Sequence, residues 1–172
     1  MGWLSKVLGS VPKEELDGLR LDLGNLFWDV DGPKTFTAMM TALDGWLPDN
    51  SILYFEAGSP AKEITEFMAT AAIPEQTHVA YGTIWPRPRV YHVPANHQTL
   101  ARLCEIMEHH AEPELAVHFH VYNQGRMLIE WHDAFSQPML ITGEIPEERI
   151  QELAQRFGTE YRRGRTKKLS LS

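Results

Sequence analysis

Apolar residues recur at intervals of three and four positions in four parts of the chain, and this spacing predicts amphipathic helices. Pro48 is placed to end the first helix, and Ser59 and Asn96 are predicted caps of the second and third. Gly158 is placed to end the fourth. The four apolar stripes are Phe36, Met39, Met40, Leu43 and Leu47; Ile64, Phe67, Met68 and Ala71; Leu100, Leu103, Ile106 and Met107; and Ile150, Leu153 and Phe157.

Short apolar or alternating stretches predict strands between these helices. Residues 51–56 include four consecutive apolar positions, which is typical of a strand buried on both faces and central in its sheet. The other expected strand regions are 19–30, folded as a small hairpin at Gly24-Asn25 or as a bent strand; 79–85; 89–93; and 115–142, which contains three consecutive strands.

This order of elements predicts an α/β (or α+β) fold. Strand-helix units followed by an antiparallel meander and a final helix are typical of a single domain with a mixed sheet. We expect the domain to span residues 1–160, with short helices at 3–9 and 12–17, and residues 161–172 to form a basic, disordered tail.

The composition is that of a globular protein that folds without a structural metal or a disulfide. The chain has 172 residues, of which 43% are hydrophobic and 23% are charged, and a domain of this size buries enough surface to be stable. Cys104 is the single cysteine, which excludes an internal disulfide. Because neither a bilayer-spanning apolar run nor a signal-peptide layout is found, we expect a cytoplasmic protein with no membrane partner.

Charge is distributed unevenly along the chain. The formal net charge is −7, but five of the 16 basic residues lie after residue 161, so that residues 1–161 hold 11 basic and 23 acidic residues, a charge of −12. An acidic body repels phosphate backbones. We therefore do not expect nucleic-acid binding, except through the basic tail.

The register of one predicted hairpin decides which way three histidines face. A two-residue loop at Gln124-Gly125 would mix polar and apolar side chains on both faces, so we predict a three-residue loop, Asn123 to Gly125. This loop would pair Val121 with Met127, Phe119 with Ile129 and Val117 with Trp131 on one apolar face. The opposite face would collect His118, His120, Tyr122, Arg126, Leu128, Glu130 and His132, with His118 directly across from Glu130.

Two interpretations of this polar face remain open. His118, His120, Glu130 and His132 have the donor types of a zinc or iron centre, which would activate a bound water in a hydrolase- or oxygenase-type enzyme. In the favoured alternative no cofactor is bound, and the face is a polar binding or solvated surface that includes Tyr122. His118 and Glu130 would then form a charge-assisted pair across the strands.

The run from Leu26 to Gly32 is an apolar strand that leads into Asp-x-Asp-Gly. It resembles the opening motif of the haloacid dehalogenase superfamily, which implies Asp29 as a nucleophile for phosphoryl transfer, Asp31 as an acid/base group and magnesium as a cofactor. The next residue is Pro33 where the family has Thr or Val, and we find neither the later acidic metal-binding pair nor the motif lysine of the family. A helix start prepared by Asp31 and Gly32 explains the same residues.

The segment Trp85-Pro-Arg-Pro-Arg89 is a candidate contact loop. Proline stiffens the segment, and Trp and Arg are enriched at binding hot spots, so Trp85, Arg87 and Arg89 are predicted binding residues if the loop is exposed. If it is buried, Trp85 belongs to the core and the prolines shape a turn.

These observations favour a binding protein over an enzyme. We expect the protein to bind another protein or a small ligand through the polar sheet face or through the loop at 82–89. A bacterial accessory or toxin-immunity protein has such a profile, because an acidic domain neutralises a basic partner by charge complementarity. The alternative is the metal-dependent enzyme described above.

Overall fold

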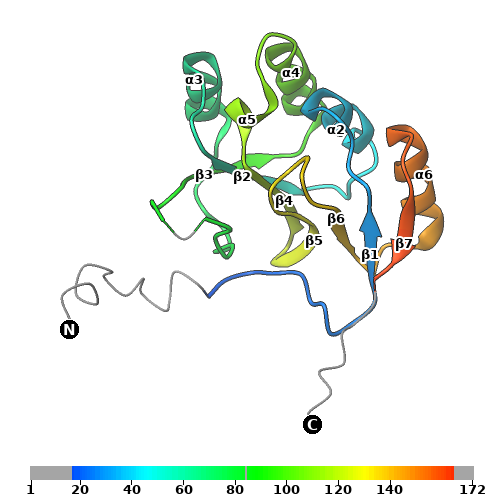
Figure 1. The fold of residues 1–172 in the computed structure, drawn as a ribbon. Helices are drawn as coiled ribbons and strands as arrows, with labels where there is room; N and C mark the ends of the chain where they lie inside the picture. The colour runs from blue at the N-terminus through cyan, green and yellow to red at the C-terminus, as the bar shows by residue number, and fades with distance from the viewer. Residues whose placement is uncertain (1–16, 84, 165–172) are drawn as a thin grey trace, which may run out of the picture.

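The computed structural model describes residues 17–83 and 85–164. They form an α/β domain in which the helices lie on one face of a seven-stranded sheet (Figure 1). The strands are β1 (Phe27–Val30), β2 (Ile52–Ala57), β3 (Arg89–Pro94), β4 (His118–Asn123), β5 (Arg126–Trp131), β6 (Met139–Thr142) and β7 (Tyr161–Arg163). The helices are α2 (Phe36–Leu43), α3 (Lys62–Ala71), α4 (His97–Met107), α5 (Glu112–Leu115) and α6 (Glu147–Phe157).

The fold class predicted from the sequence is confirmed, and the sheet is antiparallel. The strand order is β3-β2-β4-β5-β6-β1-β7, and neighbouring strands pair antiparallel throughout rather than in the expected mixed arrangement. β2 lies inside the sheet between β3 and β4 and is buried along its whole length, as its apolar run predicts. No helix in the described ranges is long and apolar enough to cross a bilayer.

The four helices predicted from periodicity are present, but the end predicted for the first is wrong: α2 ends at Leu43, with Asp44 as its C-cap, before it reaches Leu47 and Pro48. In α4 the Asn96 side chain accepts a hydrogen bond from the Thr99 amide, and Gly158 ends α6 in the left-handed conformation at φ 69°. The predicted Ser59 cap is wrong, because α3 begins two residues later than expected, with Ala61 as a cap that has no side-chain bond.

Three other expectations are corrected. Residues 19–30 do not form a hairpin: only 27–30 are a strand, β1, because they pair with β6 and β7. The described part of 79–85 contributes only an isolated bridge, Leu19 with Val79. Residues 161–163, expected to begin a disordered tail, form β7 at the edge of the sheet. The remainder of the tail and both amino-terminal helices, apart from Asp17, fall outside the residues that the structure describes.

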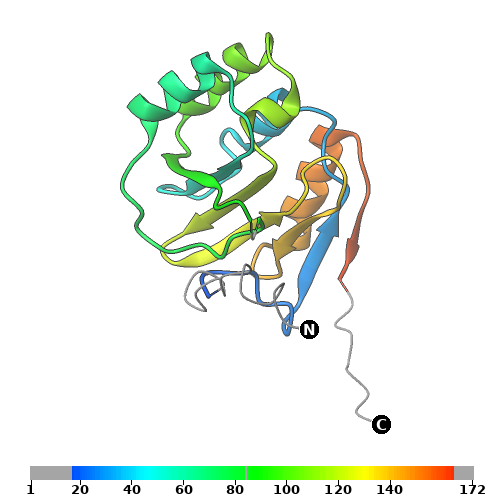
Figure 2. The same ribbon diagram turned by 60° about the vertical axis from the view of Figure 1, so that its left-hand side comes forward.

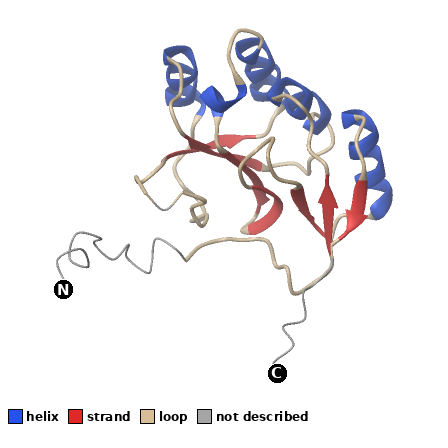
Figure 3. Ribbon diagram, in the orientation of Figure 1, coloured by secondary structure: helices blue, strands red, loops and turns tan. Residues whose placement is uncertain are grey.

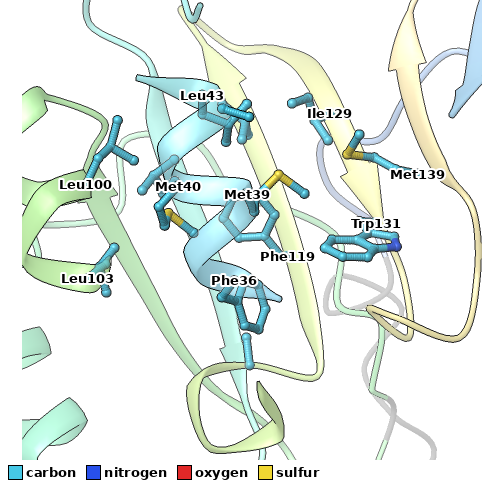
Figure 4. Close-up of a cluster of buried hydrophobic side chains, with 14 of the residues drawn as sticks. Phe36, Met39, Met40, Leu43, Leu100, Leu103, Phe119, Ile129, Trp131 and Met139 are labelled. Carbon is cyan, nitrogen blue, oxygen red and sulfur yellow. The ribbon is translucent and has the colours of Figure 1, made fainter. Parts of the chain in front are cut away.

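The main core lies between the helices and the sheet (Figure 4). Phe36 on α2 is fully buried and contacts the rings of Phe119, Trp131 and Phe135 edge-to-face, at centroid distances of 5.9, 6.2 and 4.9 Å. Contacts of this kind add to the burial of aromatic area. Phe36 therefore joins α2 to the centre of the sheet.

The second face of the sheet is covered by irregular chain instead of helices. Figures 2 and 3 show helices on one side of the sheet and loop segments, including residues 17–26 and 72–83, on the other. These two segments add apolar side chains to a smaller core on this face, which consists of Leu21, Phe27, Ile52, Tyr54, Val79, Tyr122 and Met127. The polar residues singled out in the sequence lie beside this smaller core.

We predict that Phe36→Ala lowers the free energy of unfolding by roughly 3 to 5 kcal/mol, because it removes a buried ring and leaves a cavity. Urea unfolding followed by circular dichroism measures the change. The control is Leu23→Ala, since Leu23 is 44% exposed and outside both cores. Equal losses in the two variants would contradict this role of Phe36.

Candidate functional site

The β4–β5 hairpin brings together the four candidate metal ligands, but in a different register from the predicted one. His120, not His118, is opposite Glu130. The predicted three-residue loop is wrong: Asn123 pairs with Arg126 across the two-residue turn Gln124-Gly125, whose φ angles are 48° and 74°. Positive φ at both positions is what a two-residue hairpin turn requires.

A β-bulge reconciles this short turn with the apolar face. Val121 pairs with Ile129 and Tyr122 with Met127, so Leu128 is an extra residue in β5. The extra residue shifts the pairing of the two strands by one position. Val121 and Ile129 therefore stay in the main core between the helices and the sheet. Leu128, predicted on the polar face, packs in that core, whereas Met127 lies in the smaller core on the other face.

The polar face is buried, which corrects the expectation of an open or solvated surface. Glu56 and His120 are each 1% exposed, and His118 and Glu130 are also buried. Of the four candidate metal ligands only His132 keeps partial exposure, and Arg126, at the turn of the hairpin, is exposed. The hydrogen bonds of two buried carboxylates explain how irregular segments cover this face.

Glu130 holds the segment at residues 17–26. Its Oε2 accepts the Leu21 amide at 2.6 Å, and its Oε1 lies 2.7 Å from His132 Nε2. Burial opposes ionisation of Glu130, but the hydrogen bonds from His132 and Leu21 outweigh it and lower the pKa of the carboxyl group. We call the irregular segments 17–26 and 72–83, which lie over this face of the sheet, the cover. The charged form of Glu130 therefore stabilises the cover.

Glu56 holds the loop that precedes Trp85. Its Oε2 accepts the Gly82 amide at 2.9 Å and its Oε1 the Thr83 amide at 2.5 Å, while the Tyr54 hydroxyl donates to Oε2 at 3.2 Å. The sequence analysis missed Glu56. The available signal was an acidic residue at the end of an otherwise apolar stretch of strand, where a buried charge needs partners.

Gly82 allows the loop to approach the sheet closely. A Cβ atom at this position would lie 2.7 Å from the His118 ring, closer than packed side chains tolerate. The His118 ring therefore lies against the loop backbone, with its Nε2 3.9 Å from Glu56 Oε1.

Backbone hydrogen bonds fix the tautomers of two histidines. The Asp133 amide donates to His118 Nδ1 and the Trp131 amide donates to His120 Nδ1, both at 3.0 Å. Each Nδ1 must therefore carry a lone pair, and the proton of the neutral ring is on Nε2. Burial, followed by the neighbouring His132, lowers the pKa of His120 to about 3, and burial also lowers the pKa of His118.

This geometry gives no support to a metal centre. The His132 ring lies 5.3 Å from the His118 ring and 4.8 Å from the His120 ring, measured between centroids. Even so, no group of three or more His, Cys, Asp or Glu side chains among residues 17–83 and 85–164 is arranged to hold a metal ion. The described residues therefore offer no donor set for the zinc or iron alternative.

Tyr122, a predicted binding residue, is buried in the smaller core. Its hydroxyl is 2.9 Å from His92 Nδ1, and burial raises the pKa of the phenol. Its position makes it part of the packing beneath the cover.

Asp29 and Asp31, implied by the resemblance to the haloacid dehalogenases, both bind one arginine. Arg162 on β7 lies 2.8 Å from Asp29 Oδ1 and 3.3 Å from Asp31 Oδ1. The two carboxylates thus help to attach β7 to β1, which is a structural use of the motif.

Trp85, Arg87 and Arg89 lie on the surface. Trp85 is 83% exposed, whereas Trp28, Trp46 and Trp131 are buried. Beside the loop is a groove of about 570 Å³ to which Arg87 and Arg89 contribute, together with Gly58 and Pro60 between β2 and α3. Of the four predicted binding residues, Tyr122 is buried and these three are exposed.

Comparison with known proteins gives no relative for this chain: no family model, curated protein or solved structure matches it.

We predict that Glu56→Ala lowers the free energy of unfolding by roughly 2 to 4 kcal/mol, because the Gly82 and Thr83 amides lose their acceptor. Hydrogen exchange at these two amides should accelerate more than exchange in β5. The control is the exposed Glu66→Ala, for which a change below about 0.5 kcal/mol is expected. Unchanged exchange at residues 82 and 83 would show that Glu56 does not anchor the loop.

We predict that acid destabilises the fold from about pH 6.5 downward. The pKa of His120 is about 3 when folded and near 6.5 when unfolded, so the unfolded state binds more protons between these values. The free energy of unfolding then falls with pH by up to about 1.4 kcal/mol per unit for this group. His120→Gln should have a shallower slope in urea titrations from pH 4 to about pH 6.5. A His120 titration near pH 6.5, measured by NMR in the folded protein, would contradict this.

Proposed function

We propose that the chain is a protein-binding module whose contact surface is formed by Trp85, Arg87 and Arg89. The observation that carries the proposal is the 83% exposure of Trp85. A large aromatic side chain in water forgoes the burial that stabilises the other described tryptophans, and Trp and Arg are the residue types that dominate binding hot spots.

The attachment of the loop supports the same proposal. Glu56 accepts two consecutive amides at Gly82 and Thr83, and the Arg87 guanidinium lies 6.0 Å from the centre of the Tyr81 ring. Pro86 and Pro88 restrict the backbone further. A surface that is ordered before it meets its partner loses less conformational entropy on binding.

The burial of the histidine-rich face argues against the other binding surface suggested by the sequence. A partner could reach His118 or His120 only by displacing the segments held by Glu56 and Glu130. An interaction at the Trp85 loop requires no such opening.

A second candidate is the neutralisation of a basic partner, as in toxin-immunity proteins, through the acidic remainder of the surface. Its support is the excess of 23 acidic over 16 basic residues. Acidic surfaces steer basic partners and raise association rates. This candidate predicts binding that depends on salt but not on Trp85.

The test is site-specific photo-crosslinking in cells that express the chain naturally. A photo-reactive phenylalanine analogue at position 85 should capture a partner that the same analogue at the exposed position 26 does not. With the purified partner, Trp85→Ala should weaken binding about 30-fold, the effect of a hot-spot residue. The thermal midpoint of this variant should match that of the wild type, because Trp85 packs little.

Equal capture at positions 85 and 26 would overturn the proposal. So would a partner whose affinity for Trp85→Ala stays within about twofold of wild type, a change too small for a hot spot. If that partner is basic and its binding weakens with salt, the neutralisation candidate replaces the first proposal.

A further inference from the structure

We propose that the Trp85 surface takes an acidic segment of its partner, with carboxylates held by Arg87 and Arg89 in the groove beside the loop. This inference rests on the proposed function and adds the chemistry of the partner. The groove has a volume of about 570 Å³, which is within the range of sites that enclose ligand groups.

The groove combines rigid apolar walls with two cationic groups. Pro60, Pro86, Pro88 and Val117 form apolar parts of the lining, and Arg87 and Arg89 supply the charge. Proline rings change shape little, so the walls need little ordering when a ligand enters. The apolar walls suit the backbone and aliphatic parts of a peptide, and the arginines suit its carboxylates.

The charge of this groove is opposite to that of the rest of the surface. Among the described residues that line it there is no Asp or Glu, although the chain as a whole has a net charge of −7. Arg89 is exposed, and its side chain forms neither an ion pair nor a hydrogen bond with another residue in the described ranges. Most other described cations already have carboxylate partners: Lys62, Arg102, Arg126, Arg149, Arg156, Arg162 and Arg163.

Arg87 is oriented by Tyr81. Its Nη2 lies 3.4 Å from the Tyr81 hydroxyl and its guanidinium lies over the Tyr81 ring. The planar fork of a guanidinium matches the two oxygens of a carboxylate. Arg87 and Arg89 are two positions apart and both reach the same groove, so an extended acidic segment could meet them together.

A protein carboxylate fits this surface better than a nucleic acid. Binding of single strands without sequence preference uses several stacking aromatic side chains along a continuous basic groove. Here Trp85 is the single exposed aromatic residue among the large apolar side chains of the described ranges. The acidic body around the loop would also repel a phosphate backbone that extends beyond the groove.

The experiment selects binders from a library of random peptides, about ten residues long, displayed on phage. The full chain is the target, and the Arg87→Gln, Arg89→Gln double variant is a parallel target. We expect Asp and Glu to be enriched about threefold in the wild-type selection, relative to both the input and the double variant.

A synthetic peptide carrying the selected consensus is then titrated by calorimetry. Arg89→Gln should weaken its binding about tenfold, a loss typical of an exposed charge-assisted contact. Arg126→Gln is the matched control, because Arg126 is also an exposed arginine. It lies at the turn of the β4–β5 hairpin, whereas the groove is lined by Val117 beside the start of β4. This variant should bind as the wild type does.

The outcomes separate the two proposals. Peptides that need Trp85 but carry no acidic enrichment overturn the acidic-segment inference and leave the proposed function standing. If no selected peptide depends on either Trp85 or the two arginines, both fail. If a thymidine octanucleotide binds more tightly than the selected peptide and loses affinity in Arg89→Gln, the ligand is a phosphate backbone and the inference is wrong.

Discussion

The carboxylates of Glu56 and Glu130 join the irregular half of this protein to its regular half. Helices cover one face of the seven-stranded sheet, and the other face would expose Ile52, Tyr54 and Tyr122 to water if no chain lay across it. Residues 17–26 and 72–83 have no helix or strand that would satisfy their amides internally. Glu56 and Glu130 accept three of these amides, so the apolar contacts of the cover depend on two buried charges.

Burying these charges is costly, and the cluster around them shows how the cost is offset. A buried carboxylate is stable only when hydrogen bonds replace its water. Each of these two carboxylates accepts at least one backbone amide and also contacts a side chain, His132 for Glu130 and Tyr54 for Glu56. The histidines next to them are neutral because His118 and His120 use Nδ1 as an acceptor. In this way the polar cluster on the sheet serves the fold, and the recognition surface that we propose is the loop anchored by this cluster.

The sequence predicted what depends on local pattern and missed what depends on distant partners. The spacing of Phe36, Met39, Met40 and Leu43 identifies α2 because one stripe faces the core, and the same argument locates α4 and α6. It places His118, His120 and Glu130 on one face, since side chains alternate along a strand. It could not show that this face is buried, because Leu21 meets Glu130 across 109 positions of sequence. The register failed for a related reason: alternation assumes an unbroken ladder, and Leu128 interrupts it.

The short strand β7 has a consequence for how copies of this protein stay apart. β1 would be the outer strand without it, with unpaired amides and carbonyls beside the buried rings of Phe27 and Trp28. Such an edge is a template for a strand from another chain. β7 occupies that edge with only three residues and is attached by Arg162 to Asp29 and Asp31. Its two arginines are already paired, Arg162 with Asp29 and Asp31 and Arg163 with Glu147. An edge of three residues offers another chain few free amides and carbonyls, so β7 closes this side of the sheet against strand addition.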